Sequence, residues 1–114
     1  MSNFVTLVVE DDAFQREALA ELLKDDGFEV IECATAEAAE LVIASSGTEL
    51  QALVTDNNLP GVMSGAELAQ YASCQHPKMN IIIISGMKMN HIPVNATFLQ
   101  KPFTAEQLLD AVRD

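Results

Sequence analysis

The chain has 114 residues, enough for one domain, and 49% of them are hydrophobic, enough for a core at this size. Aromatic residues are few and tryptophan is absent, so we expect this core to be aliphatic. Seventeen acidic residues against six basic ones give a formal net charge of −11, which repels nucleic acids and anionic lipids and suits a cation or a basic protein partner.

The chain begins with a strand pattern followed by a helical one. Residues 4–9 form a compact β-type run, and residues 13–26 show helical spacing that ends at Gly27, a typical C-cap residue. One face of this predicted helix is apolar, so it is expected to pack on the core. Its members are Phe14, Ala18, Leu19, Leu22 and Leu23.

The middle of the chain repeats this order. Residues 28–33 largely alternate between polar and apolar, as a half-exposed edge strand does. Thr35 is placed to cap a helix that runs to about residue 45, because its hydroxyl can accept a hydrogen bond from the first turn. Residues 52–55 then predict a short buried strand, and residues 64–73 predict a further helix.

The last third contains four consecutive isoleucines, Ile81–Ile84, a run with no polar face that is typical of an interior parallel strand. Residues 96–100 predict a final strand, and Thr104 and Gln107 have the spacing of a capping box that opens the last helix. The alternation of strands and helices favours one α/β domain over residues 1–114, with a doubly wound parallel sheet.

One connection is shorter than this architecture usually requires. Only residues 86–95 separate the fourth and fifth predicted strands, and they include Gly86, Pro93 and Asn95. A crossover that contains a helix normally takes at least about 10–12 residues. We therefore expect the fourth helix to be missing or reduced to a turn.

Polar side chains directly follow four of the five predicted strands. Because the carboxyl ends of parallel strands meet at one edge of the sheet, where ligands bind, these side chains are expected to converge. They are Glu10, Asp11 and Asp12 after the first strand, Asp56 after the third, Ser85 after the fourth and Lys101 after the fifth.

This set of side chains predicts a particular chemistry. Clustered carboxylates repel one another unless a cation is present, and Mg²⁺ is a hard cation that prefers oxygen ligands. One carboxylate, Asp56, can then act as a nucleophile toward a phosphoryl group whose oxygens Lys101 and the Ser85 hydroxyl hold. Asp12 is expected instead to cap the first helix.

Four motifs together resemble the receiver domain of two-component response regulators, and the resemblance covers nearly the whole chain. No single motif is specific, but all four occur in order at strand ends. They are Val8-Val9-Glu10-Asp11-Asp12, Thr55-Asp56-Asn57-Asn58-Leu59-Pro60-Gly61, Ser85-Gly86 and Lys101-Pro102-Phe103. The resemblance implies a flavodoxin-like fold with strand order 2-1-3-4-5.

The resemblance also implies roles for the acidic residues. Asp56 would be the phosphoacceptor and, with Asp11, a direct Mg²⁺ ligand. Glu10 would act on the metal ion through water, and the backbone carbonyl of Asn58 would be a further ligand. No other cofactor is implied.

The remaining family roles fall at the fourth and fifth strands. Ser85 and Lys101 would contact the phosphoryl group, and Gly86 would leave room beside it. Phe98 matches the switch aromatic that turns inward when Ser85 moves toward the phosphate, although it lacks the hydroxyl of the commoner tyrosine. The Lys101–Pro102 peptide bond would be cis.

By this resemblance the chain is a phosphorylation-dependent signalling switch rather than an enzyme, although it would support its own phosphorylation and slow self-dephosphorylation. A sensor histidine kinase or a histidine phosphotransfer protein would supply the phosphoryl group, and an unidentified downstream protein would read it by contact. The shortened link at residues 86–95 reshapes a surface where many receivers dock partners. The chain is either a stand-alone receiver or the receiver of a larger protein, such as a hybrid kinase.

Three other functions match parts of the pattern. The first is a pseudo-receiver, a constitutive interaction module without the chemistry. The second is a phosphatase of the haloacid-dehalogenase-like class, which pairs its nucleophile with a second aspartate where this chain has Asn58. The third is a flavodoxin-like FMN protein, for which the acids after the first strand have the wrong charge beside a phosphate.

The sequence also indicates a compartment. No signal-peptide pattern is visible at the start of the chain, and the apolar runs at residues 4–9 and 81–84 are too short to span a bilayer. Cys33 and Cys74 lack the spacing of a metal or redox motif. We therefore expect a cytoplasmic protein whose cysteines are reduced.

Overall fold

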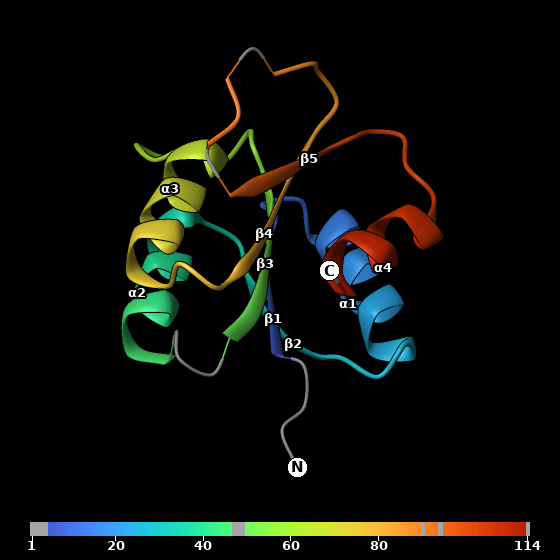
Figure 1. Cartoon of the computed structure of the whole chain (residues 1–114). Helices are drawn as coiled ribbons and strands as arrows, with labels where there is room; N and C mark the ends of the chain where they lie inside the picture. The colour runs from blue at the N-terminus through green and yellow to red at the C-terminus, as the bar shows by residue number, and fades with distance from the viewer. Residues whose placement is uncertain (1–4, 47–49, 90, 94, 114) are drawn as a thin grey trace.

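A computed structural model of the chain describes residues 5–46, 50–89, 91–93 and 95–113 (Figure 1). Five strands and four helices are formed in these ranges. In chain order they are β1 (Val5–Val9), α1 (Ala13–Asp25), β2 (Glu29–Cys33), α2 (Ala36–Ser46), β3 (Leu50–Asp56), α3 (Gly65–Gln75), β4 (Asn80–Ser85), β5 (Ala96–Gln100) and α4 (Ala105–Arg113). The bounds match the predicted elements closely, except that β3 is longer and includes Asp56 as its last residue.

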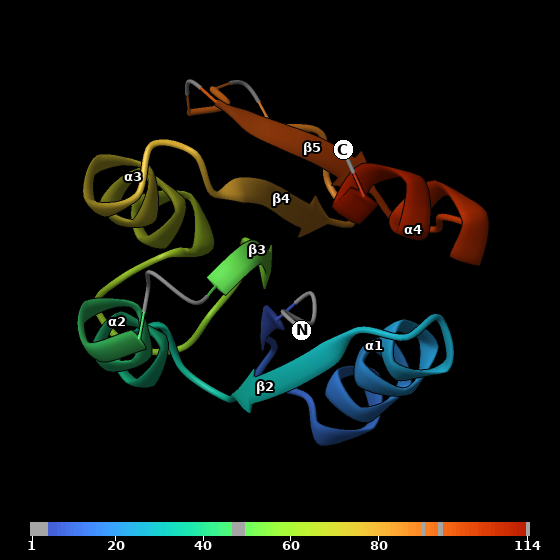
Figure 2. The same ribbon diagram turned by 60° about the horizontal axis from the view of Figure 1, so that its bottom comes forward.

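The five strands form one parallel sheet in the order β2-β1-β3-β4-β5, which confirms the predicted topology. Helices α1 and α4 cover one face of the sheet and α2 and α3 cover the other, as Figure 2 shows. The partly exposed strand β2 lies at one edge, as its alternating pattern predicted. The parallel order brings the carboxyl ends of all five strands to the same edge.

Two hydrophobic cores lie on opposite faces of the sheet. Successive strand residues point to opposite faces, so the isoleucine run of β4 divides between the cores and is buried throughout. The core under α2 and α3 includes Leu7, Val9, Leu68, Ile81 and Ile83. The core under α1 and α4 includes Val8, Leu23, Ile82, Ile84 and Leu108.

Side-chain caps fix where the helices start, because they satisfy backbone N–H groups that have no partner inside the helix. At α2, Thr35 Oγ1 accepts from the N–H of Ala38 at 3.1 Å. At α4, Thr104 Oγ1 accepts from the N–H of Gln107 at 3.1 Å, and the Gln107 side chain accepts from the N–H of Thr104 at 2.8 Å. The Thr35 cap and the Thr104–Gln107 capping box are thereby confirmed.

The predicted apolar face of α1 is wrong at its first turn. Phe14 is 82% exposed, whereas Leu23 is fully buried in the core beside the sheet. The geometry of the helix explains the difference, because nine residues at about 100° each place Phe14 on the side of the helix opposite Leu23. Ala18 is also exposed, so the buried face of α1 is formed by its second half.

The link between β4 and β5 has no helix in its described residues, 86–89, 91–93 and 95, in line with the short connection. The N–H of Ala96 donates to the carbonyl of Pro93 at 3.2 Å, which closes a turn before β5. Asn95 has a φ of 73° in this turn, a left-handed conformation that asparagine tolerates better than most residues.

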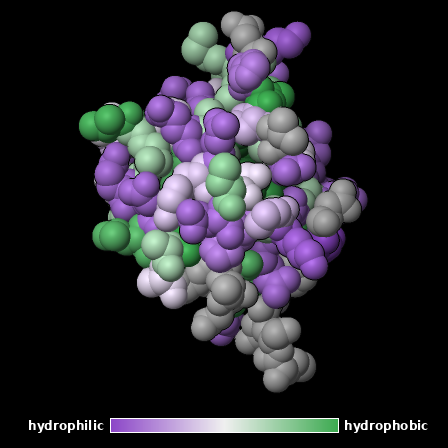
Figure 3. Space-filling model, turned by 60° about the vertical axis from the view of Figure 1, so that its left-hand side comes forward, coloured by the Kyte–Doolittle hydropathy of each residue, from purple (hydrophilic) through white to green (hydrophobic). Residues whose placement is uncertain are grey.

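The face of the molecule drawn in Figure 3 is largely hydrophilic, and hydrophobic residues appear on it as separate groups. Among the described residues, no helix is both long and apolar enough to cross a membrane. Both cysteines are free: Cys33 is buried and Cys74 is exposed.

Candidate functional site

Asp56 lies at the carboxyl end of the central strand β3 and is 9% exposed. Its backbone is fixed on both sides: the hydroxyl of Thr55 donates to the Asp56 carbonyl at 3.0 Å, and the N–H of Asn57 donates to Ile84 of β4 at 2.8 Å. The N–H of Asn58 lies 3.3 Å from Asp56 Oδ1. The carboxylate is therefore presented at the sheet edge by a backbone that neighbouring strands hold.

Two further carboxylates come to the same place from the end of β1. Glu10 is 2% exposed and Asp11 is exposed, and one oxygen of each lies within 4.8 Å of the other and of an Asp56 oxygen. Burial raises the pKa of Glu10 to about 7; the charge of Asp56 adds to this rise, and the N–H of Asp12 opposes it. Three carboxylate groups thus offer oxygen ligands at one place. Oxygen ligands of this kind suit a hard divalent cation.

Lys101 supplies the positive charge of the site. It follows β5, and its Nζ lies 3.6 Å from Asp56 Oδ2 and 3.7 Å from Glu10 Oε1. These are ion pairs rather than close hydrogen bonds, because charge-assisted N–H···O bonds are usually about 2.7–2.9 Å long. The ammonium has a shorter contact, 2.9 Å, to Oε1 of Gln15 in α1.

Ser85 is the last residue of β4 and is 2% exposed. Its backbone carbonyl accepts from the N–H of Lys101 at 2.9 Å, so the ends of β4 and β5 are adjacent. Its hydroxyl accepts from the N–H of Met87 at 3.1 Å. Phe98 is half-buried on β5, in register with Ile83 of β4.

Helix α3 begins so close to the backbone of Asp56 that only glycine fits at position 65. A Cβ at Gly65 would lie 2.1 Å from the backbone oxygen of Asp56 and 2.7 Å from Cα of Asn57, far inside van der Waals contact. The first residue of α3 therefore contacts the backbone of Asp56 directly. At Gly86 a Cβ would meet no atom within 4 Å, so the space beside Ser85 is open on that side.

Several hydrogen bonds hold the connection from β3 to α3 in place. The Asn57 side chain accepts from the N–H of Ala66 at 3.1 Å, and its backbone carbonyl accepts from the N–H of Gly65 at 3.0 Å. Further along, Glu37 of α2 accepts from the N–H of Met63 at 3.3 Å. These bonds hold the loop that the resemblance assigns to metal binding.

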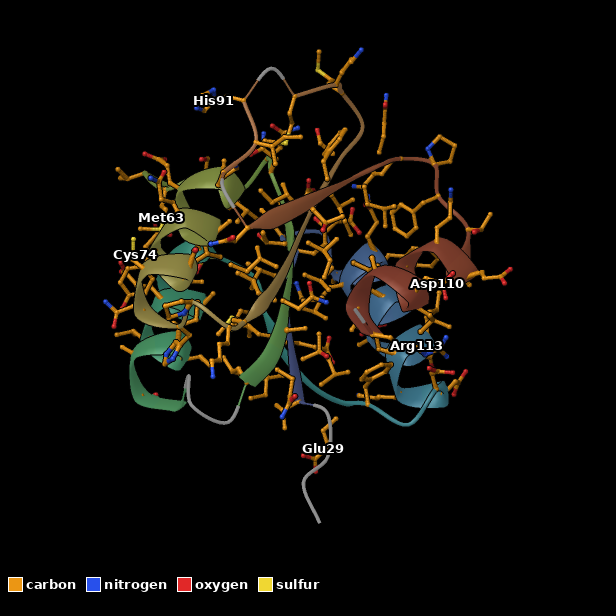
Figure 4. The ribbon with its side chains drawn as sticks, viewed as in Figure 1. Glu29, Met63, Cys74, His91, Asp110 and Arg113 are labelled. Carbon is orange, nitrogen blue, oxygen red and sulfur yellow. The ribbon has the colours of Figure 1, made fainter. Side chains whose placement is uncertain are left out.

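Two hollows flank the carboxylates. One, of about 250 Å³, is bounded by Asn57 and Asn58 after β3, by Ser85, and by four residues of the next link, Met87, Lys88, Met89 and His91. Figure 4 shows His91 at the end of the molecule opposite Glu29. The other, of about 370 Å³, is an apolar groove between α1 and residues 101–103, with Gln15 and Lys101 in its lining. The first hollow has a lining of mixed polarity, whereas the second is largely apolar.

The structure brings Glu10, Asp11, Asp56 and Lys101 together at one edge, with Ser85 beside Lys101. Asn58 and Phe98 lie on adjoining elements. The side chain of Asp12 is not one of the clustered carboxylates. It caps α1, accepting from the N–H of Gln15 at 2.9 Å, as expected. The Lys101–Pro102 peptide bond is cis, also as expected.

Sequence reasoning did not find two α1 residues that contact the site. Arg16 donates from Nη1 to the carbonyl of Glu10 at 2.8 Å and pairs with Glu32 of β2 at 3.6 Å. Gln15 holds Lys101. A sequence signal was present, because both residues lie in the first turn of the helix that follows Asp12, but that position also suits ordinary surface residues.

Comparison with known proteins identifies the same pattern. The family model "Response regulator receiver domain" matches residues 6–113. The chain is 34% identical over 112 residues to the response regulator protein FleR of Pseudomonas aeruginosa, covering 93% of this chain and 23% of FleR. Across the first curated relatives that it matches, the chain spans 23 to 52% of their length.

Solved structures match over almost the whole chain. A response regulator receiver protein from Sinorhizobium medicae WSM419 superposes with a TM-score of 0.89 at 28% identity, covering 97% of this chain and 92% of that one. The receiver domain of the hybrid histidine kinase CckA superposes with a TM-score of 0.80 at 31% identity, covering 96% and 95% of the two chains.

Proposed function

Because this chain belongs to the response regulator receiver domain family, we propose that Asp56 is its phosphoryl acceptor and that phosphorylation switches its contacts with other proteins. The observation that carries the proposal is the position of one almost buried carboxylate, Asp56, among two further carboxylates and the ammonium of Lys101. A histidine kinase or a histidine phosphotransfer protein is the proposed donor.

The chemical step joins an Asp56 carboxylate oxygen to phosphorus while the N–P bond of the donor's phosphohistidine breaks. The histidine nitrogen keeps the electron pair of that bond and takes up a proton from water. Carboxylates are competent nucleophiles in such transfers, and the surrounding groups act mainly by positioning and by charge. Lys101 would pair with one phosphoryl oxygen, and the Ser85 hydroxyl would donate to another.

We propose Mg²⁺ as the cofactor, held directly by Asp11, Asp56 and the carbonyl of Asn58 and by Glu10 through water. The three clustered carboxylates support this choice, since each is more easily ionised beside a divalent cation. When bound, the ion neutralises charge on the carboxylates and on the entering phosphoryl group. The N–H of Asn57 donates to the carbonyl of Ile84, and this bond helps to hold the backbone next to Asn58 in place.

The proposed readout involves Ser85, Phe98 and the link between β4 and β5. The hydroxyl of Ser85 accepts from Met87, so a move of Ser85 toward a phosphoryl group would pull on the start of the link. Phe98, which is only half-buried, would turn inward behind it. The proposed downstream partner is a protein that binds the altered link. In a longer protein that contains this domain, the same contact would regulate the activity of the rest of the chain.

The test is phosphorylation by acetyl phosphate, followed by intact mass. Wild-type protein with Mg²⁺ is expected to gain one phosphoryl mass, whereas Asp56→Asn and the metal-free wild-type sample gain none. Asp110→Asn on α4, an exposed residue far from the cluster, is the matched control and should behave as wild type.

If the wild-type protein gains no mass, Mg²⁺-dependent binding of beryllofluoride, a stable phosphoryl mimic, distinguishes a short-lived phosphate from a dead site. Absence of both mass gain and beryllofluoride binding would overturn the proposal and leave a pseudo-receiver that acts as a constitutive contact module.

A further inference from the structure

Three helices of this fold begin with a cap residue followed three positions later by a glutamine or glutamate. In α3 and α4 the pair closes on itself. Ser64 and Glu67 exchange side-chain and backbone hydrogen bonds at 3.1 and 2.9 Å, and Thr104 and Gln107 do the same. This reciprocal capping box satisfies two backbone N–H groups locally.

The third pair, Asp12 and Gln15 of α1, is only half closed. Asp12 accepts from the N–H of Gln15 at 2.9 Å, but the Gln15 side chain does not return to the N–H of Asp12. Glu10 Oε2 occupies that N–H at 3.1 Å instead. The amide of Gln15 is thereby released from capping, and its oxygen accepts from Lys101 Nζ, a residue 86 positions away.

The contact with Gln15 sets where the Lys101 ammonium lies. At 2.9 Å it is a hydrogen bond of ordinary length, whereas the carboxylates of Asp56 and Glu10 lie 0.7 and 0.8 Å farther from the ammonium, at 3.6 and 3.7 Å. The lysine stem is flexible, so an untethered ammonium would close onto the nearest carboxylate. That closure would occupy an oxygen that a metal ion needs.

We propose that Gln15 is a positioning residue that holds the Lys101 ammonium off the carboxylates of Asp56 and Glu10, so that a divalent cation can reach them. The inference rests on the proposed function, because it concerns the same site, and it adds a component from α1. Gln15 also lines the apolar groove beside α1, so a partner that enters this groove and contacts the glutamine would alter cation binding at Asp56.

The measurement is the Mg²⁺ affinity of the metal-free protein, followed by amide shifts in NMR spectra as MgCl₂ is added. Gln15→Met keeps the length of the side chain but removes the acceptor. It should weaken Mg²⁺ binding about two- to five-fold, the size expected for one exposed polar contact to a charged group. Gln15→Glu retains an acceptor oxygen and should bind Mg²⁺ at least as tightly as wild type.

A matched pair of controls changes the same residue type elsewhere. Gln70 is exposed on α3, and Gln70→Met and Gln70→Glu alter composition and net charge equally. Gln70→Met should leave the Mg²⁺ affinity unchanged, and Gln70→Glu measures the effect of one added negative charge alone.

A double-mutant cycle separates positioning from a general structural effect. If Gln15 acts through Lys101, then Gln15→Met should leave the Mg²⁺ affinity unchanged when it is made in a Lys101→Met background. The same loss in both backgrounds, or wild-type affinity in Gln15→Met, would overturn the inference.

Phosphorylation gives a second readout. The rate with acetyl phosphate should fall in Gln15→Met at low Mg²⁺ and return to the wild-type rate at saturating Mg²⁺, whereas a deficit that persists at saturation contradicts the inference. The affinity cycle needs no phosphoryl transfer. If the wild-type protein binds Mg²⁺ and follows the predicted double-mutant cycle but gains no phosphoryl mass and binds no beryllofluoride, the proposed function alone is refuted. If it binds no Mg²⁺, both proposals are refuted.

Discussion

Two segments leave the sheet near the carboxylate cluster, one after Asp56 and one after Ser85, and they differ in how many hydrogen bonds hold them. The loop from Asn57 to Ser64 is fastened by the side chain and backbone of Asn57, by Glu37 and by the capping box of α3. The link after Ser85 has bonds near its two ends, from Met87 to Ser85 and from Ala96 to Pro93, in the residues that the structure describes. Its Met87 and Ile92 are 74% and 41% exposed.

The difference separates two tasks at one site. In the proposed function the loop after Asp56 supplies a metal ligand, and its dense hydrogen bonding raises the free energy of its local opening. The described residues of the link, 86–89, 91–93 and 95, have fewer such hydrogen bonds, so a change at Ser85 can alter them at a lower cost in free energy. Substitutions in the two segments should therefore differ in their effect on stability.

The largest expected effect is at Gly65. Gly65→Ala forces a methyl group against the backbone of Asp56 and Asn57, which cannot yield as a flexible side chain would, and should cost about 3 kcal/mol or more in the free energy of unfolding. Urea denaturation measures this cost. Gly86→Ala, where the methyl group meets open space, is the matched control and should change stability by less than about 0.5 kcal/mol.

A smaller loss is expected when the capping box at the end of the loop is opened. Ser64→Ala removes the hydroxyl that accepts from Glu67 and should lower the free energy of unfolding by about 1 kcal/mol. Thermal or urea unfolding reports the change. Ser64→Thr keeps an acceptor oxygen and should recover most of the loss; equal destabilisation by both variants would mean that the cap contributes little.

Glu37 tests the tie between α2 and the loop. Glu37→Ala leaves the N–H of Met63 to water, which should cost only about 0.5 kcal/mol because the bond is exposed. Glu37→Gln retains a side-chain oxygen and should be nearly neutral. Hydrogen exchange at the Met63 amide is the sensitive measurement, and unchanged exchange in Glu37→Ala would show that the bond does not protect the loop.

The smallest effects should come from the link. Met87→Gln and Ile92→Gln replace exposed apolar side chains and should each shift the free energy of unfolding by less than about 0.5 kcal/mol. Met89 of the link already packs against the core under α2 and α3. A loss above about 1 kcal/mol in urea denaturation would show that Met87 or Ile92 packs on the fold as well, and would remove the contrast with the loop.

The order of elements could be predicted because it depends on local signals, whereas the strand order was implied by the resemblance to receiver domains. Apolar periodicity, the caps at Thr35 and Thr104, and the few residues between β4 and β5 are all visible over short stretches of sequence. The convergence of the strand ends then follows from the parallel arrangement itself.

Features that depend on residues distant in the sequence could not be predicted. Phe14 is spaced four residues before Ala18, as on one helix face, but which side of α1 meets the sheet depends on the fold, and the side that does carries Leu23. Gln15 has the spacing of a capping residue, and only the fold reveals that Lys101 lies within its reach. Glu37 looks like an ordinary acid in a first helical turn, and its partner Met63 lies 26 positions away.

The close contact of Gly65 with Asp56 makes the free energies of two binding events interdependent. The start of α3 and the acceptor backbone meet with no side chain between them, so neither can shift without displacing the other. A protein that binds α3 more tightly after phosphorylation must, by thermodynamic reciprocity, favour the phosphorylated form by the same factor. If Asp56 is phosphorylated as proposed, a partner bound to helix α3 would both sense the phosphorylation state of Asp56 and bias it.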